Sequence, residues 1–365
     1  MEDPVFTPDE PLVPEEGPAA EHVPEQASPG GTEDRSATLV KRARRVFSTL
    51  GLGAFVILIL GSLLQIGLSA LLSAAAPDLL EKPLMLWVVT FVPLYCIAVP
   101  MGMALMCRAH AHPAPAERFG AGGVLALFPI CIFLAYAGNF LGILATTGLS
   151  ALRGSEIANP LQTYAMGDGP FLVKLLVMAI LAPLIEELIF RRVMIDRMRI
   201  YGEKLAVVTS ALIFGLFHGN LSQFFYAFFL GLVFGYVYVR TGRLAYSAAL
   251  HIFINFLGSI IAPWLLSRAD LDSLSDFDPT SLLYAGALER FLTPGRVAFF
   301  AYIFALILLF LLGLVLLCIL GSRLTFYEAE RELPRGKRFT TVWCNVGMAL
   351  LLVASLGVML LSVLL

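Results

Sequence analysis

The chain has 365 residues, of which 58% are hydrophobic and 14% are charged, and its mean hydropathy is +0.83. Because about a quarter of the residues of a soluble domain are charged, this composition excludes an ordinary soluble protein. The formal net charge of −2 does not bear on nucleic-acid binding, but no basic segment is interleaved with aromatic residues, so no nucleic-acid partner is expected.

The charged residues cluster between long apolar runs. Several of these runs exceed the ~20 residues that a helix needs to cross a hydrocarbon core of about 30 Å. A backbone in lipid must satisfy its own hydrogen bonds, and the runs lack the period-two alternation of a membrane barrel. We therefore expect an all-α protein, a polytopic transmembrane bundle of about eight or nine helices.

The first 40 residues differ from the rest of the chain, because they combine seven prolines with many Glu and Asp and almost no large apolar residue. Such a segment cannot bury enough apolar surface to fold. It also lacks the basic start and early apolar run of a secretory signal. Residues 1–45 are therefore predicted to be a disordered, acidic cytoplasmic tail that ends in the basic cluster 41–45.

Nine apolar runs follow the predicted tail. They cover residues 46–75, 83–107, 121–149, 171–191, 204–219, 223–240, 246–266, 297–320 and 340–364. We divide them into N-terminal membrane helices (46–150), a central region (151–266), and an external loop with the C-terminal helices (267–365).

The distribution of basic residues predicts the orientation of these helices. With nine helices and the N-terminus inside, the inner segments hold most of the 25 Lys and Arg residues. The outer side keeps only Lys82, Arg153, Arg268, Arg290 and Arg296, with Lys174 near an outer helix end. Because cytoplasmic loops are enriched in Lys and Arg, we expect a multi-pass cell-membrane protein with a cytoplasmic N-terminus and an external C-terminus.

Three of the apolar runs contain polar residues within the predicted membrane helix, where such residues are energetically unfavourable. Charged and strongly polar groups occur within 182–191, 214–218 and 251–255. A charged group inside a membrane helix costs several kcal/mol, so each of these groups is a candidate functional residue. The isolated amides Gln65 and Asn139 are instead expected to bond to neighbouring helices.

Helical geometry separates the two adjacent acids. Glu187 and Arg191 are four residues apart and share a face, so they can form an ion pair. Glu186 lies about 100° around the helix and has no basic partner on it. Pro183 should kink the helix just before these acids, because it cannot donate a backbone hydrogen bond.

His251 and Asn255 are also four residues apart, so the imidazole and the amide point the same way. His218 lies near the outer end of a short helix. Counted from the nearest inner charges, Glu186 lies about 8 Å deep and His251 about 12 Å. We therefore expect the site in the cytoplasmic half of the bilayer.

A carboxylate, two imidazoles and an amide could hydrolyse a peptide bond. The reaction needs a base for water and donors for the oxyanion. Glu186 and His218 can share the water, while His251 and Asn255 can donate to the oxyanion. No GxSxG motif and no intramembrane aspartate pair occurs, so serine and aspartyl mechanisms lack support.

Three motifs in this order resemble the CPBP family of intramembrane proteases, also called the Abi or type II CAAX prenyl endopeptidase family. Its EExxxR, FxxxH and HxxxN motifs match 186–191, 214–218 and 251–255. The resemblance covers about 170–260 and implies an intramembrane endopeptidase. Many members have glycine after the motif arginine, where this chain has Arg192.

The resemblance also implies roles for individual residues. Glu186 is expected to be the catalytic base, with His218 as its partner on the water. His251 and Asn255 are expected to form the oxyanion hole. Glu187, Arg191 and the motif phenylalanine Phe214 are expected to support the site.

The substrate is expected to be a membrane-anchored or lipid-modified protein or peptide, with a prenylated CAAX tail as one candidate. Zinc is an alternative to the metal-free mechanism, since Glu186, His218 and His251 would suit a site with two histidines and a glutamate. We favour the metal-free mechanism, because Asn255 is a poor zinc ligand and a good amide donor.

Two other functions are compatible with the sequence. Buried Glu and His residues also mark proton-coupled transporters. Such transporters often consist of two repeated halves, and no such repeat occurs in this chain. A catalytically silent scaffold or immunity protein could use the same fold, although the full set of four proposed catalytic residues argues against it.

Overall fold

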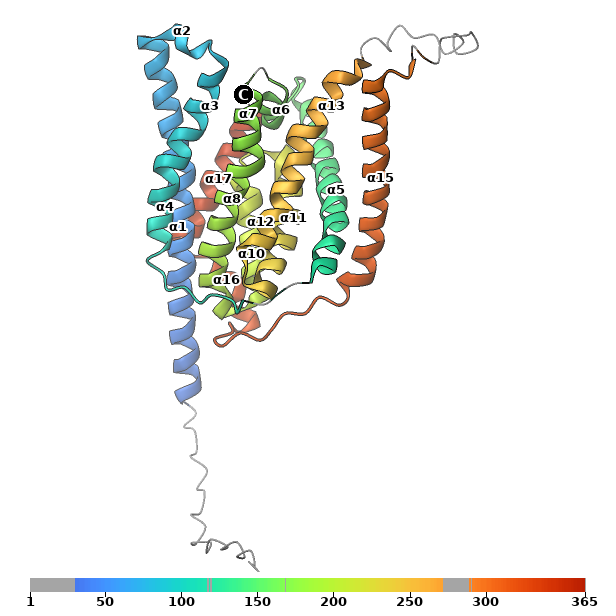
Figure 1. The fold of residues 1–365 in the computed structure, drawn as a ribbon. Helices are drawn as coiled ribbons and strands as arrows, with labels where there is room; N and C mark the ends of the chain where they lie inside the picture. Colours follow the sequence, from blue (N-terminus) through green and yellow to red (C-terminus); the bar gives the residue numbers. More distant parts are fainter. Residues whose placement is uncertain are drawn as a thin grey trace, which may run out of the picture.

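The structure, a computed structural model, describes residues 30–116, 118, 120–167, 169–271, 289 and 291–364. Within these residues every regular element is a helix, and the long helices lie side by side in one bundle (Figure 1). The predicted all-α class is therefore confirmed. Residues 1–29, most of the predicted tail, lie outside the described residues.

The first helix, α1 (Gly30–Ala75), is longer than predicted. Its 46 residues correspond to about 69 Å, and its first turns project beyond the bundle (Figure 1). The part of the predicted tail from residue 30 to 45 is therefore helical, which corrects the prediction. This stretch has no proline and ends in the basic cluster 41–45, whose Lys, Arg and Ala residues favour a helix, so it continues the membrane helix into the polar region.

The other membrane helices alternate in direction, so the two ends of the described chain lie at opposite ends of the bundle (Figure 1). The remaining long helical segments are α3–α4 (Pro83–Met106), α5 (Ala121–Arg153), α7–α9 (Phe171–Met198), α10 (Glu203–Phe217), α11 (Leu221–Thr241), α12–α13 (Leu244–Ala269), α15 (Pro294–Gly321) and α17 (Val346–Leu364). Shorter helices are α2 (Pro77–Leu80), α6 (Pro160–Met166) and α16 (Arg338–Trp343).

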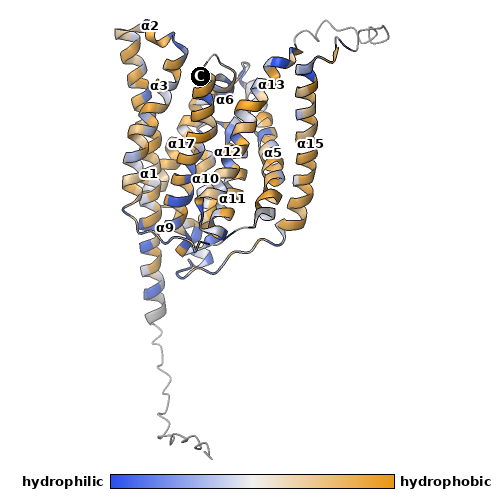
Figure 2. Ribbon diagram, viewed as in Figure 1, coloured by the Kyte–Doolittle hydropathy of each residue, from blue (hydrophilic) through white to orange (hydrophobic). Residues whose placement is uncertain are grey.

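Seven of these helices are long and apolar enough to cross a membrane, compared with the nine predicted spans. The two that differ are α7–α9 and α10. The first carries charged residues at 174, 186, 187, 191, 192, 196 and 197, and the second has only 15 residues. Both pack against several other helices of the bundle (Figures 1 and 2). Each also has apolar side chains exposed on the outside, such as Leu181 and Val208.

Helix α11 lies at the centre, packed against α5 on one side and α10 on the other. Small residues bring the backbones together: a Cβ atom added at Gly138 of α5 would lie 2.6 Å from the Tyr226 nitrogen of α11. Helix α15 packs outside α5, and α1 packs with α4 and α17. Close packing of this kind stabilises membrane bundles, because lipid supplies no hydrophobic drive between helices.

Three helices change from π- to α-helical hydrogen bonding just before a proline. The π-helical stretches are η1 (Pro93–Ala98), η2 (Leu175–Leu181) and η5 (Leu257–Ile261). Each ends two residues before a proline, at positions 100, 183 and 263. Proline cannot donate to the preceding turn and its ring crowds that turn, so the widened turn accommodates it. A kink was predicted at Pro183, and the structure has a π-helical stretch just before this proline.

The two ends of the bundle differ in charge. We call the end with the start of α1 and the segments 107–120, 199–203, 241–243 and 321–338 the basic end. We call the other end, with 76–82, 154–170, 218–220, 269–271 and the C-terminus, the far end (Figure 1). The basic residues that the sequence assigned to inner segments lie at the basic end, apart from Arg191.

Candidate active site

One cavity of about 680 Å³ lies inside the bundle, and all four predicted catalytic residues line it. Glu186 comes from α8 (Ala182–Glu187), and His218 follows α10. His251 and Asn255 come from α12 (Leu244–Phe256). Tertiary packing thus brings together side chains that are up to 69 positions apart in the sequence. Most of the remaining wall is apolar or aromatic, as is typical of ligand-binding cavities.

His251 connects the two acids. Its Nε2 atom lies 3.5 Å from Glu186 Oε2, and its Nδ1 atom lies 3.1 Å from Glu187 Oε1. An ionised carboxylate only accepts hydrogen bonds, so Nδ1 carries the proton toward Glu187 and Nε2 faces the cavity. The side chain of Glu186 is 23% exposed, whereas that of Glu187 is fully buried.

The predicted pair of Glu187 and Arg191 is present in the core. Arg191 Nη2 lies 3.1 Å from Glu187 Oε1, and both side chains are completely buried. The guanidinium lies between two aromatic rings, 4.9 Å from the centre of Phe214 and 5.6 Å from that of Phe234. This pair holds Glu187 ionised and in place beside His251.

Phe214 contacts both imidazoles. Its ring centre lies 5.0 Å from that of His218 and 5.7 Å from that of His251, each in an edge-to-face arrangement. Phe234 of α11 stacks on the other side of His251, at 4.9 Å and 28° between the ring planes. The sequence analysis missed Phe234, because an aromatic residue in an apolar helix carries no signal of its own.

His218 stands at the end of α10, where Gly219 turns the chain with a φ of 65°. Its Nδ1–H donates to the Phe214 carbonyl oxygen at 2.9 Å, because a carbonyl can only accept. In the neutral ring the Nε2 atom therefore keeps its lone pair. This nitrogen can accept a hydrogen bond from a water molecule.

Asn255 is oriented by the backbone of α7–α9. Its Nδ2 atom donates to the Met178 carbonyl oxygen at 3.1 Å. This carbonyl belongs to the π-helical stretch, in which the Ala182 nitrogen bonds to Val177. The next donor in that pattern would be Pro183, which has no N–H group. The proline thus leaves a free carbonyl that fixes the Asn255 amide.

The cavity wall also contains polar residues that the sequence analysis did not assign to the site. Among them are Tyr95, Tyr136, Asn139, Asn220, Gln223, Tyr226 and Tyr302. Asn139 was expected to bond to a neighbouring helix, and the structure places it in the cavity wall instead. Gln65 does bond across helices, to the Thr90 carbonyl oxygen at 2.6 Å.

The alternative zinc site would need three converging ligands. Among the described residues, no group of three or more His, Cys, Asp or Glu side chains is placed to hold a metal ion. Glu186 contacts His251 directly, and the Nδ1 atom of His218 is bonded to backbone. The Nε2 atoms of both imidazoles stay available to a ligand, since a metal-bound histidine also donates from its other ring nitrogen to a backbone or carboxylate oxygen. The choice of the metal-free mechanism over zinc therefore stays a prediction.

The position of the site along the bundle differs from the prediction. Glu186 lies 15 residues after the start of α7 and 12 before the end of α9, so it is about 18 Å from the basic end. The predicted depth was counted from Arg191, which lies in the core as the partner of Glu187. The site is therefore deeper than predicted, near the middle of the bundle, and still slightly nearer to the basic end than to the far end.

Comparison with known proteins agrees with the motifs. Residues 168–257, about a quarter of the chain, match the family model described as type II CAAX prenyl endopeptidase Rce1-like. The matched region contains Glu186, His218 and His251 with the helices that carry them. No curated protein and no solved structure is significantly similar to this chain. The central region is therefore similar to an Rce1-like domain, and it lies in a polytopic membrane protein.

Proposed function

We propose that this protein is an intramembrane endopeptidase that cleaves a membrane-associated protein or peptide with a water molecule activated by Glu186. The observation that supports this most is the cavity of about 680 Å³ in which Glu186, two imidazoles and an amide meet. The two imidazoles and the amide are each held in place by a hydrogen bond, either to a backbone carbonyl or to Glu187. Preorganised polar groups of this kind suit a hydrolase.

In this proposal the water molecule lies between Glu186 and His218. The carboxylate and the His218 Nε2 atom each accept one of its hydrogens, and Glu186 removes the proton as the oxygen attacks the peptide carbonyl. Glu186 then carries that proton to the leaving amine. General acid–base help of this kind typically contributes 10²- to 10⁴-fold in rate.

The oxyanion that develops is stabilised by His251 and Asn255. Asn255 uses one hydrogen of its amide for Met178 and keeps the other for the oxyanion. His251 donates from Nε2 when its ring is protonated, and the buried Glu187 stabilises that cation through Nδ1. Glu187 is thus a positioning residue in this scheme, since it does not contact the substrate.

The experiment that tests this proposal measures peptide release by the purified protein in detergent. Glu186→Gln and His218→Ala should lower kcat at least about 100-fold, and Asn255→Ala about 100- to 1,000-fold, because each removes a group needed in the transition state. Glu330→Gln, at an exposed acid of the basic end that does not line the cavity, is the control and should cleave normally.

The substrates would be membrane-anchored peptides with and without a prenyl group, each tested with and without a strong chelator. Cleavage that resists the chelator would support the metal-free mechanism, and loss restored by zinc would refute it. If the folded wild-type protein cleaves none of the peptides, or if Glu186→Gln cleaves as well as wild type, the proposed protease activity is wrong. The scaffold and transporter functions would then be the ones to test.

A further inference from the structure

The walls of the cavity are distributed unevenly along the bundle. Beyond the site itself they include Tyr164 of α6, Asn220 and Gln223 at the start of α11, and Val358 and Ser362 near the end of α17. All of these lie toward the far end (Figure 1). None of the described residues that line the cavity belongs to the segments of the basic end.

A packed layer separates the cavity from the basic end. Phe190, Arg191, Met194 and Ile195 follow Glu186 toward that end, and each is completely buried. Phe234 of α11 closes the same layer and is also completely buried. Because protein interiors are packed as densely as organic crystals, this layer leaves no path for a peptide.

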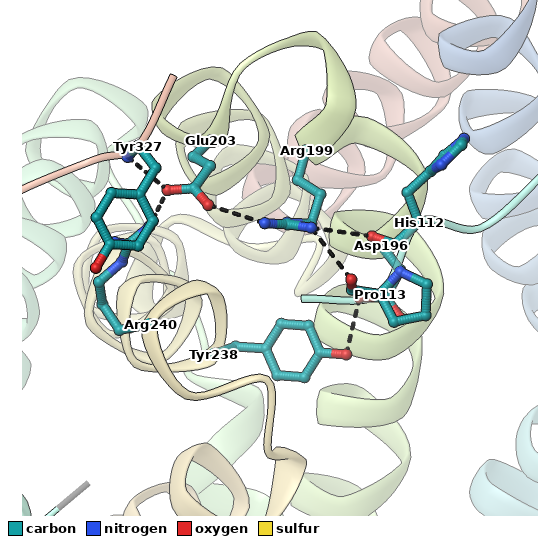
Figure 3. A network of polar contacts seen from close by, with 8 residues as sticks. All are labelled: His112, Pro113, Asp196, Arg199, Glu203, Tyr238, Arg240 and Tyr327. Carbon is teal, nitrogen blue, oxygen red and sulfur yellow. Dashed lines mark hydrogen bonds and ion pairs between the residues drawn. The ribbon is translucent and has the colours of Figure 1, made fainter. Parts of the chain in front are cut away.

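A polar network closes the basic end behind this layer (Figure 3). Glu203, 3% exposed, accepts from Arg199 at 3.1 Å and from the Tyr327 backbone at 2.9 Å, and it also pairs with Arg240. Tyr238 donates to Asp196 at 2.9 Å. These contacts tie α9, α10, α11 and the 321–338 segment together. Backbone hydrogen bonds to Ile200 and Tyr201 fix the same segment.

The network is built from buried charges that support one another. Asp196 is 1% exposed, and Arg192 lies 3.3 Å from it. Burial raises the pKa of the Asp196 carboxyl above its usual range, while the Tyr238 hydrogen bond and Arg192 oppose the shift. Opening the basic end would break the contacts between elements, those of Glu203 with Arg240 and with the Tyr327 backbone and that of Asp196 with Tyr238. It would leave the buried Glu203 and Asp196 without these partners, which is unfavourable.

We infer that the cavity is loaded from the far end, so the substrate presents its cleavage site on the side of the membrane opposite the basic loops. With the predicted cytoplasmic N-terminus, this is the non-cytoplasmic side. The inference deepens the proposed protease function and rests on it. The substrate class is then an exported or membrane-anchored protein whose apolar peptide segment enters from that side. A prenylated tail at the basic end would not reach Glu186 by this route.

A thiol-accessibility experiment tests the inference without any need for protease activity. Cys96, Cys318 and Cys344 are replaced by serine, the buried Cys131 stays, and Cys107 at the basic end serves as the marker of that side. Ala182→Cys then places a thiol in the cavity wall, one turn from Glu186 toward the far end. A charged, membrane-impermeant thiol reagent is applied to each face of sealed, singly oriented vesicles.

Leu181→Cys is the matched control. Leu181 precedes Ala182 in the chain, is 43% exposed on the outside of the bundle, and does not line the cavity. A charged reagent should not reach a thiol in lipid at this depth, so Leu181→Cys should stay unmodified from both faces. Each variant must elute as the wild-type protein does in size-exclusion chromatography.

The expected result is that Ala182→Cys is modified from the face opposite Cys107 and protected on the face where Cys107 reacts. Modification of both thiols from the same face would overturn the inference, and so would protection of Ala182→Cys from both faces. Far-end access without cleavage of any peptide would refute the protease function and leave the access route standing. Cleavage of a peptide together with access from the basic end would support the protease function and refute the proposed access route.

Discussion

At the scale of single residues, one pair of charges organises the site. Glu187 and Arg191 are completely buried, and Glu187 is also the partner of the His251 Nδ1 atom. None of the three guanidinium nitrogens has a hydrogen-bond acceptor in the described part of the chain, and only Nη2 lies at ion-pair distance from Glu187. Arg191 therefore depends on one carboxylate and two aromatic rings, so loss of that carboxylate should be costly.

We expect Glu187→Gln to lower the free energy of unfolding by about 3–5 kcal/mol, because it leaves Arg191 as an unpaired buried cation. The double variant Glu187→Gln/Arg191→Met should lose less than the sum of the two single changes, because neither buried charge remains. Thermal unfolding in detergent measures this. Glu330→Gln, in an exposed pair with Arg331, is the control and should change little. Additive losses would show that the two residues are not coupled.

At the scale of elements, prolines shape the cavity. The three π-helical stretches that precede prolines 100, 183 and 263 all contribute residues to its wall. Wide helical turns are frequent at functional sites, because they free backbone groups that a regular helix uses internally. Here the freed carbonyl of Met178 is used to orient Asn255.

Pro183→Ala should therefore weaken catalysis at a distance from the substrate. The new N–H group can donate to the Met178 carbonyl oxygen and release the Asn255 amide. Because only oxyanion stabilisation is lost, we expect kcat to fall about 10- to 100-fold with little change in KM. Pro100→Ala changes an equivalent position after η1, where no predicted catalytic side chain is bonded, and should keep kcat. Equal losses in the two variants would contradict this role of Pro183.

At the scale of the whole molecule, close contacts between helices hold the cavity open at its centre. Helix α11 supplies Gln223, Tyr226 and Leu230 to the cavity wall and packs directly on α5. This contact requires glycine, because any side chain at Gly138 would meet the α11 backbone. Helix α11 thus forms part of the cavity wall and also makes the close contact with α5.

Gly138→Ala should cost about 1–3 kcal/mol of stability, because the added methyl group must push α5 away from α11. Gly148, also in α5, has open space around it, since a Cβ atom added there would meet no atom within 4 Å. Gly148→Ala should therefore be neutral or slightly stabilising. Thermal unfolding of the two variants side by side makes the comparison. A neutral Gly138→Ala would show that the two helices can separate at little cost.

Much of the protein follows from the sequence by itself. Composition and apolar runs determine that it is a polytopic helical membrane protein, since a backbone in lipid must bond internally. The cost of buried charge singles out Glu186, Glu187, Arg191 and His251 as the residues to examine. Helical spacing alone predicts the pair between Glu187 and Arg191, which the structure contains.

The tertiary structure decided what depends on contacts between distant segments. It placed Arg191 in the core instead of at the membrane surface. The site therefore lies deeper than the depth predicted by counting residues from Arg191. It added Phe234 to the site and linked Asn255 to the carbonyl beside Pro183. It also showed which end of the cavity is closed. Periodicity reports the faces of one helix, whereas packing determines which faces meet and where space remains between them.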